Sequence, residues 1–92
     1  MKLNALTKHR NAFALYVITE EGEGIFTATL KHYAGSVHNL PPVQITLTRG
    51  IRHWIGSAEY TMLTGDLGAA IDDFLAAGQR TLENKMNNLT DD

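Results

Sequence analysis

Apolar and β-branched side chains recur in two early segments of the chain and predict a β-hairpin. Residues 12–20 (AFALYVITE) and 25–33 (IFTATLKHY) have the composition of strands, and a cluster of Glu and Gly separates them. A two-residue turn on Gly22-Glu23 suits a type II′ hairpin, which favours Gly at its first position. This register places five apolar side chains on one face: Phe13, Leu15, Val17, Ala28 and Leu30.

A second hairpin is predicted after the Pro41-Pro42 pair. Residues 43–48 alternate apolar and polar side chains, and residues 51–56 form a further strand candidate. A two-residue turn between them would place Arg52 on the buried face. We therefore expect a three-residue loop, residues 48–50, with Gly50 in the left-handed conformation. The inward side chains would then be Val43, Ile45, Leu47, Ile51 and Ile55.

The last third of the chain has the spacing of an amphipathic helix, which we predict over residues 64–88. Thr64 or Asp66 is the expected N-cap. Gly68 and Gly78 interrupt the pattern, and each costs about 1 kcal/mol of helix stability relative to Ala. Apolar residues follow one face: Leu67, Ala70, Ile71, Phe74, Leu75, Leu82 and Met86.

These elements predict an α+β fold, a four-stranded antiparallel sheet made of two hairpins with one long C-terminal helix packed on one face. Residues 1–92 are expected to form a single domain. Within it, residues 1–11 would be a loose N-terminal arm and residues 12–56 the sheet. Residues 64–88 would be the helix, and residues 89–92 a frayed tail.

The sheet face away from this helix is expected to carry the functional surface. Two Tyr, one Trp and two Ile share it with Thr and basic groups, whereas a solvated face is usually polar throughout. The candidate interface or ligand-face residues are Tyr16, Ile18, Lys31, Tyr33, Arg52 and Trp54. Aromatic residues and Arg are enriched at protein interfaces, and aromatic rings beside basic groups also suit stacked bases.

Charge divides unevenly along a chain whose formal net charge is only −2. Residues 1–56 carry six basic and three acidic side chains, a net +3, whereas residues 57–92 carry two and seven, a net −5. A basic sheet and an acidic helix suit either an anionic partner or the pairing of two copies. An imbalance of this size also arises by chance in a small protein.

Recognisable catalytic and metal-binding patterns are missing from the sequence. The chain has no Cys, which excludes disulfides, thiol catalysis and iron–sulfur clusters. Its four His lie at 9, 32, 38 and 53, in no recognised ligand spacing. Asp72 and Asp73 are adjacent, so on a helix they would point about 100° apart and form no catalytic dyad. We therefore expect no enzyme activity, no cofactor and no metal site.

We expect a small non-enzymatic interaction module, a homodimer or a partner of another protein, that uses the sheet face away from the helix. The alternative is single-stranded nucleic-acid binding through Tyr16, Lys31, Tyr33, Arg52 and Trp54. The predicted element order resembles that of transcriptional-coactivator and whirly-type single-stranded-DNA binders, but no motif matches residue for residue. No secretory signal or membrane-spanning run is present, which predicts a cytoplasmic protein without membrane partners.

Overall fold

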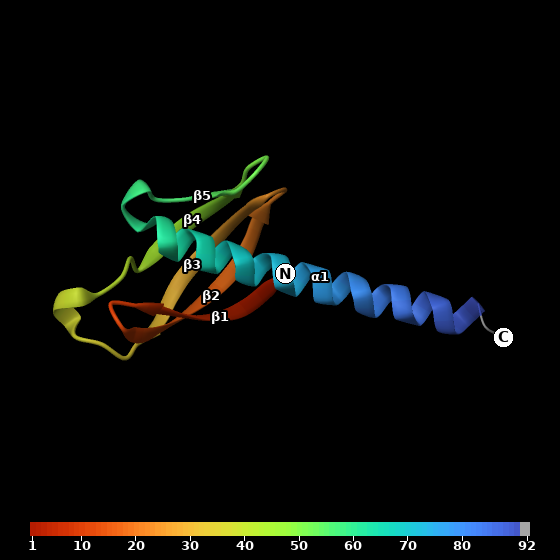
Figure 1. Cartoon of the computed structure of the whole chain (residues 1–92), viewed down its shortest axis with the longest axis horizontal. Helices are drawn as coiled ribbons and strands as arrows, with labels where there is room; N and C mark the ends of the chain where they lie inside the picture. The colour runs from red at the N-terminus through yellow and green to blue at the C-terminus, as the bar shows by residue number, and fades with distance from the viewer. Residues whose placement is uncertain (91–92) are drawn as a thin grey trace.

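The computed structural model describes the backbone of residues 1–90 and the side chains of residues 1–57 and 59–78. One antiparallel sheet and one C-terminal helix make an α+β fold, as predicted, but the sheet has five strands rather than four. The strands follow one another as a meander, and α1 crosses one face of the curled sheet (Figure 1). In order, the strands are β1 (Lys2–His9), β2 (Ala12–Gly22), β3 (Ile25–Tyr33), β4 (Gln44–Arg49) and β5 (Trp54–Ile55).

The additional strand is β1, and it replaces the predicted loose arm over residues 1–11. β1 pairs with β2 along its whole length, from Lys2 opposite Thr19 to His9 opposite Ala12. Arg10 and Asn11 join the two strands with positive φ angles of 50° and 65°, the conformation of a type I′ hairpin turn. Asn tolerates this conformation, but Arg-Asn is a weaker turn sequence than Asn-Gly. The hairpin is therefore hard to recognise from sequence.

The register predicted for the β2–β3 hairpin is wrong by one residue. Ala28 lies opposite Ile18 rather than Val17, and it is Gly24, with a φ of 72°, that takes the left-handed turn position. A one-residue shift turns every side chain of a strand to the other face. The residues of β2 that face the helix are therefore Ala14, Tyr16 and Ile18, rather than the predicted Phe13, Leu15 and Val17.

The second hairpin is also displaced from its prediction. Ile45 and Leu47 are buried as expected, whereas Val43 is 58% exposed. β5 is reduced to two residues, with Trp54 opposite Arg49 and Ile55 opposite Thr48. The loop between the strands spans residues 50–53, so Trp54 packs against the core instead of Ile51 and Ile55, both of which are exposed.

α1 (Thr61–Thr90) begins three residues before the predicted start and follows the 3-10 turn η2 (Ala58–Tyr60). Ser57 caps this turn, because its Oγ accepts a bond from the backbone N–H of Glu59 at 3.4 Å. Neither predicted N-cap has that role: Thr64 and Asp66 both lie inside the helix. Of the predicted frayed tail, residues 89–90 are helical and residues 91–92 lie outside the described part of the chain.

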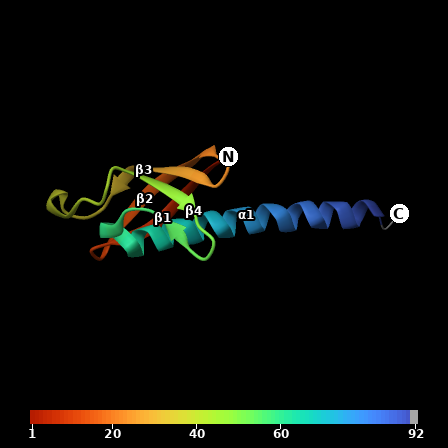
Figure 2. The ribbon, with the colours of Figure 1, turned by 90° about the horizontal axis from the view of Figure 1, so that it is seen from above.

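The core lies between the sheet and the first half of α1. Among the described residues, Leu63, Leu67 and Ile71 are the buried apolar side chains of the helix, and they follow the spacing of one helix face. Viewed from above, the rest of α1 continues past the sheet (Figure 2). The buried side chains of the sheet are Leu3, Ala5, Ala14, Tyr16, Ile18, Phe26, Ala28, Ile45 and Leu47.

The loop after β3 closes one end of the sheet. It contains the 3-10 turn η1 (Val37–Asn39), which is capped by Ser36. Pro41 at the end of this loop is buried, and Tyr16 donates its hydroxyl proton to the carbonyl oxygen of Pro42 at 2.6 Å. The proline pair therefore holds the loop against the core, and β4 begins only after it.

Candidate interaction surface

Two of the six predicted surface residues, Tyr16 and Ile18, lie in the hydrophobic core. Both are 0% exposed, on the sheet face that α1 covers. Burial, with a smaller contribution from Tyr60, raises the pKa of Tyr16 to about 12. Their predicted place on the open face is therefore wrong. The cause is the register of the β2–β3 hairpin, since a slip of one residue exchanges the two faces.

Trp54 also belongs to the helix side of the sheet. Its ring packs edge-on against Phe26, with ring centroids 5.4 Å apart. Its indole N–H donates to Asp72 Oδ2 at 3.0 Å, and the same carboxylate binds Arg49 at 3.0 Å. The guanidinium carbon of Arg49 lies 5.1 Å from the centre of the indole ring. Trp54 is therefore held between the sheet and α1.

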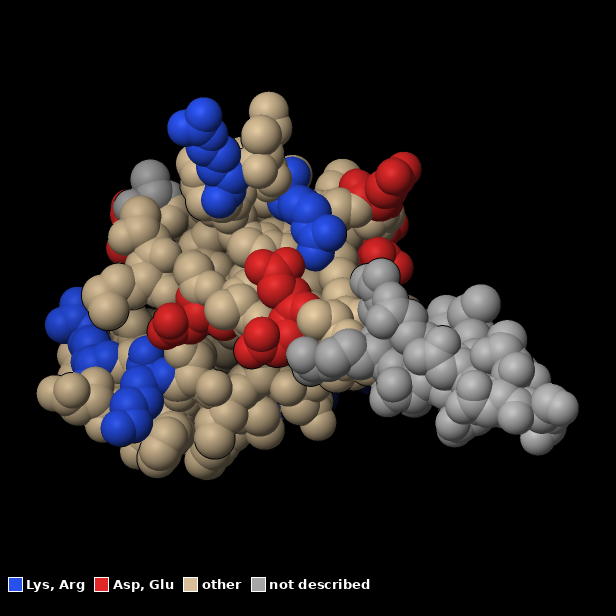
Figure 3. All heavy atoms as spheres, turned by 45° about the vertical axis from the view of Figure 1, so that its right-hand side comes forward, with Lys and Arg blue, Asp and Glu red and all other residues tan. Residues whose placement is uncertain are grey.

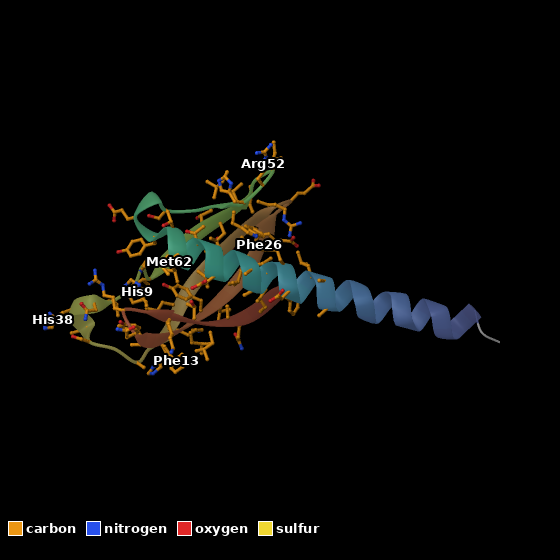
Figure 4. All side chains as sticks on the ribbon, in the orientation of Figure 1. His9, Phe13, Phe26, His38, Arg52 and Met62 are labelled. Carbon is orange, nitrogen blue, oxygen red and sulfur yellow. The ribbon has the colours of Figure 1, made fainter. Side chains whose placement is uncertain are left out.

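The other three predicted residues are spread over the surface. The hydroxyl of Tyr33 donates to the backbone carbonyl of His9 at 2.8 Å, which fixes it at the closed end of the β1–β2 hairpin. Lys31 is exposed near the end of β3. Arg52 is exposed in the loop between β4 and β5, at the top of the view in Figure 4 and far from His38 at its left. The six residues therefore do not form one surface.

The open sheet face presents a different apolar group, which we call the outer patch: Leu6, Phe13, Leu15 and Val17. Leu6 is 65% and Phe13 51% exposed, and the other two are partly buried. Leu6 lies directly opposite Leu15 in the β1–β2 pair. Phe13 alternates with the buried Ala14, and in Figure 4 it lies at the lower edge of the sheet, beside the β1–β2 hairpin. Sequence reasoning placed three of these residues in the core and missed Leu6 with the rest of β1.

Polar side chains surround the outer patch. The ammonium group of Lys8 lies 5.1 Å from the centre of the Phe13 ring, a cation–π contact worth about 0.5–1 kcal/mol at an exposed site. Lys2 and Asn4 continue the same face of β1. Towards the other edge the face is rich in threonine: Thr19, Thr27, Thr29, Thr46 and Thr48. An apolar centre with a polar rim is the usual arrangement of a protein interface.

The charge asymmetry of the sequence is partly balanced within the fold. Arg49 of β4 pairs with Asp72 of α1, and Thr7 of β1 donates to Asp66 of α1 at 3.0 Å. Figure 3 shows acidic groups in the middle and at the upper right of this face, with basic groups at its top and at its lower left. The basic half and the acidic half therefore meet inside one molecule, and no single charged patch dominates this view.

The hollows of the surface are lined by charged, polar and apolar side chains together. One of about 310 Å³ lies beside the start of α1 and combines Lys8, His9 and Arg10 with Glu59 and Asp66. A second, of about 320 Å³, lies between β5 and α1 and includes Trp54 and Thr64. Within the described residues, no three His, Asp or Glu side chains come together as metal ligands would.

A buried hydroxyl lies at the edge of this second hollow. Thr64 is 4% exposed, and its Oγ1 has no hydrogen-bond partner among the described atoms. Leaving such a group unpaired costs about 1–3 kcal/mol. The hydroxyl itself is closed off by Gly56, where any side chain would overlap Thr64. It is therefore a local cost to stability within the packing of β5 on α1.

None of the described helices is long and apolar enough to cross a membrane. Comparison with known protein families, with curated proteins and with solved structures finds no match for this chain.

Proposed function

We propose that this protein is a small non-enzymatic interaction module that self-associates through the outer patch on the β1–β2 side of its sheet. The observation that carries the proposal is the exposure of Leu6 and Phe13, which are 65% and 51% exposed beside two further apolar side chains. Contiguous apolar groups on an otherwise polar face are typical of interaction sites. A 92-residue chain also has a small core, and association increases the apolar area that it buries.

The charge of this surface is compatible with a second copy as the partner. The basic groups nearest the patch are Lys2 and Lys8 at the two ends of β1, and the centre of the strand is uncharged. With a net charge of only −2, two copies approach without strong repulsion.

The proposal predicts a dimer that depends on Leu6. Sedimentation equilibrium of the wild-type chain should give a dimer mass at about 0.1 mM, and Leu6→Ser should weaken the dimer by about 10-fold or more. Because Leu6 lies outside the core, the variant should stay folded by circular dichroism. Val37→Ser is the matched control: Val37 is 78% exposed, but it lies in η1, away from the patch.

Two results would contradict this proposal. The first is a monomer mass for the wild-type chain at about 0.1 mM, where even a weak dimer of modest affinity is populated. The second is a dimer that Leu6→Ser and Val37→Ser weaken equally, because the contact would then not be at the outer patch.

Nucleic-acid binding stays a prediction, because the aromatic side chains expected to stack on bases do not share one exposed surface. Tyr16 is buried, Trp54 lies against Asp72 and α1, and the hydroxyl of Tyr33 is bonded to His9. On the described part of the outer face, Phe13 is the exposed large aromatic side chain. Since stacking on several rings supports the binding of single strands, this arrangement favours self-association.

A further inference from the structure

The outer edge of β1 carries a row of backbone groups that bond to no other strand. The N–H of Glu20 donates to the carbonyl oxygen of Met1 at 3.2 Å, which identifies Met1 and Glu20 as a hydrogen-bonded pair. Such pairs alternate along an antiparallel ladder, so odd-numbered residues of β1 bond to β2. Even-numbered residues point their N–H and C=O groups away from the sheet: Lys2, Asn4, Leu6 and Lys8.

Within the described part of the chain, α1 packs against β1, but no strand pairs with its outer edge. β1 is the last strand on its side of the sheet, and no other strand pairs with it besides β2 (Figure 1). Proteins commonly block a free edge with Pro, a bulge or a charge. β1 has an uninterrupted register and no Pro or Gly, and its two Lys lie at its ends. The middle of the edge is therefore open for pairing.

We propose that a second copy adds its own β1 to this edge, antiparallel, with the two-fold axis at Leu6. This inference rests on the proposed function, because it specifies how the two copies meet. Leu6 of one copy lies opposite Leu6 of the other, and Asn4 lies opposite Lys8 on each side. The two sheets join into one continuous sheet of ten strands, and the two outer patches lie side by side across the axis.

Two leucines at the axis and the position of the like-charged pairs favour this register over those centred on Ala5 and Asn4. A register centred on Ala5 sets Lys2 opposite Lys8 twice, and like charges opposite one another are unfavourable. One centred on Asn4 sets Lys2 against Leu6. The register centred on Leu6 joins two leucines at the axis and places each Lys8 beside an amide. Its like-charged pair, Lys2 opposite Arg10, lies at the ends of the contact, where Arg10 belongs to the hairpin turn. This register makes six backbone hydrogen bonds, because three pairs of residues each exchange two.

The space beside β1 is consistent with an added strand. A hollow of about 520 Å³ lies at the first half of β1, lined by Lys2, Leu3, Asn4 and Phe74. Phe74 is 45% exposed beside this hollow. The hairpin turn of the second copy would lie over the hollow in the register centred on Leu6, since Asn4 pairs with the residue two positions before that turn. The contact would therefore cover Phe74 as well as Leu6.

Amide hydrogen exchange tests the pairing directly. In the dimer, the amides of Asn4, Leu6 and Lys8 should exchange about 10-fold or more slowly than in dilute, monomeric protein. The amides of Leu3, Ala5 and Thr7 serve as the internal control, because they bond to β2 in both states. Equal exchange of the even-numbered amides in monomer and dimer would overturn the pairing, while the dimer mass would still support the proposed function.

Single cysteines test the register, because the chain has no Cys of its own. Opposite residues of an antiparallel pair have Cα atoms about 5.5 Å apart, within the range of a disulfide. Under mild oxidation Leu6→Cys should form a covalent dimer. Asn4→Cys should not, because two residues at position 4 would lie about 13 Å apart along the strands. Cross-linking of Asn4→Cys but not Leu6→Cys would overturn this register.

Proline at position 6 separates the backbone contact from the side-chain contact. Leu6→Pro removes an N–H that β2 does not use, so the internal ladder stays intact. It should weaken the dimer at least about 10-fold more than Leu6→Ala, which removes the side chain and keeps the N–H. Equal weakening by the two variants would overturn edge pairing. The cysteine experiment decides the question by itself if the proline variant does not fold.

Discussion

Gly68 shows how a residue that is unfavourable by itself is required by its surroundings. In a helix a glycine costs about 1 kcal/mol relative to Ala, and Gly68 is buried in α1. A side chain at this position would overlap the indole ring of Trp54. The glycine therefore provides the surface on which Trp54 packs, and it brings β5 close to the helix.

Replacing Gly68 should have the opposite effect from replacing a neighbouring glycine. Gly68→Ala should lower the free energy of unfolding by about 1–3 kcal/mol, because its methyl group displaces Trp54. Gly65→Ala is the matched control. Nothing lies within 4 Å of a Cβ at Gly65, so this variant should raise stability by about 1 kcal/mol. Urea unfolding followed by Trp54 fluorescence measures both, and two changes of the same sign would contradict the packing described.

Tyr16 should make the protein sensitive to alkaline pH. Burial raises its pKa to about 12, whereas a tyrosine in the unfolded chain ionises near pH 10. The folded state therefore favours the neutral phenol, which donates to Pro42. Its stabilising contribution is complete below about pH 10 and is lost as the pH rises towards 12. Unfolding free energies measured across this window should fall for the wild-type chain.

Tyr16→Phe is the control for the alkaline prediction. It removes the ionisable hydroxyl and the bond to Pro42, so the variant should be less stable at neutral pH. Its stability should then fall less steeply than that of the wild type between about pH 10 and 12. Equal slopes for the two proteins would show that other groups cause the alkaline loss.

At the scale of elements, β5 depends on α1 for its position. Only two residues of β5 pair with β4, and the indole of one of them, Trp54, donates a hydrogen bond to Asp72 of the helix. Asp72 accepts bonds from both Trp54 and Arg49 at 3.0 Å. Because Arg49 and Asp72 are about half exposed, their ion pair contributes only about 0–1 kcal/mol. The cluster therefore fixes the geometry of β5 more than it adds global stability.

Asp72→Ala should loosen β5 without unfolding the domain. We expect a loss of at most about 1 kcal/mol in unfolding free energy, with a larger change in the fluorescence of Trp54. Asp73→Ala is the matched control, since Asp73 is the next residue of the helix and is exposed. A Trp54 spectrum that changes equally in both variants would contradict the role of Asp72.

Strand registers limit how much of these elements can be predicted from sequence. Ala28, Ile45 and Leu47 are buried as predicted, because their alternation is regular. β2 carries apolar side chains on both faces, so its pattern does not say which face is buried. The turn between β2 and β3 sets the register and therefore the buried face, and Gly24 rather than Gly22 has the positive φ angle. The candidate surface changed with that turn, because it moved Tyr16 and Ile18 to the core.

At the scale of the whole molecule, the elongated form follows from α1. The molecule extends 59 Å along its longest axis and 27 and 19 Å along the others. The sheet covers the first half of the helix. Among the described residues, Ile71 is the last buried side chain of α1, and Phe74 and Leu75 beyond it are partly exposed. Short helices are marginal in water by themselves and gain stability from packing. Self-association at the β1 side of the sheet would bring a second copy close to this exposed part.

By itself, the sequence determined the fold class, the order of most strands and the position of the long helix. Periodicity is a local property, because the 3.6-residue repeat of a helix and the two-residue repeat of a strand can be recognised without knowing how the elements pack. Tertiary structure decided which face of β2 is buried, that residues 2–9 form a strand, and that Trp54 lies under the helix. Each of these depends on contacts between residues far apart in the chain, whose energies exceed local preferences.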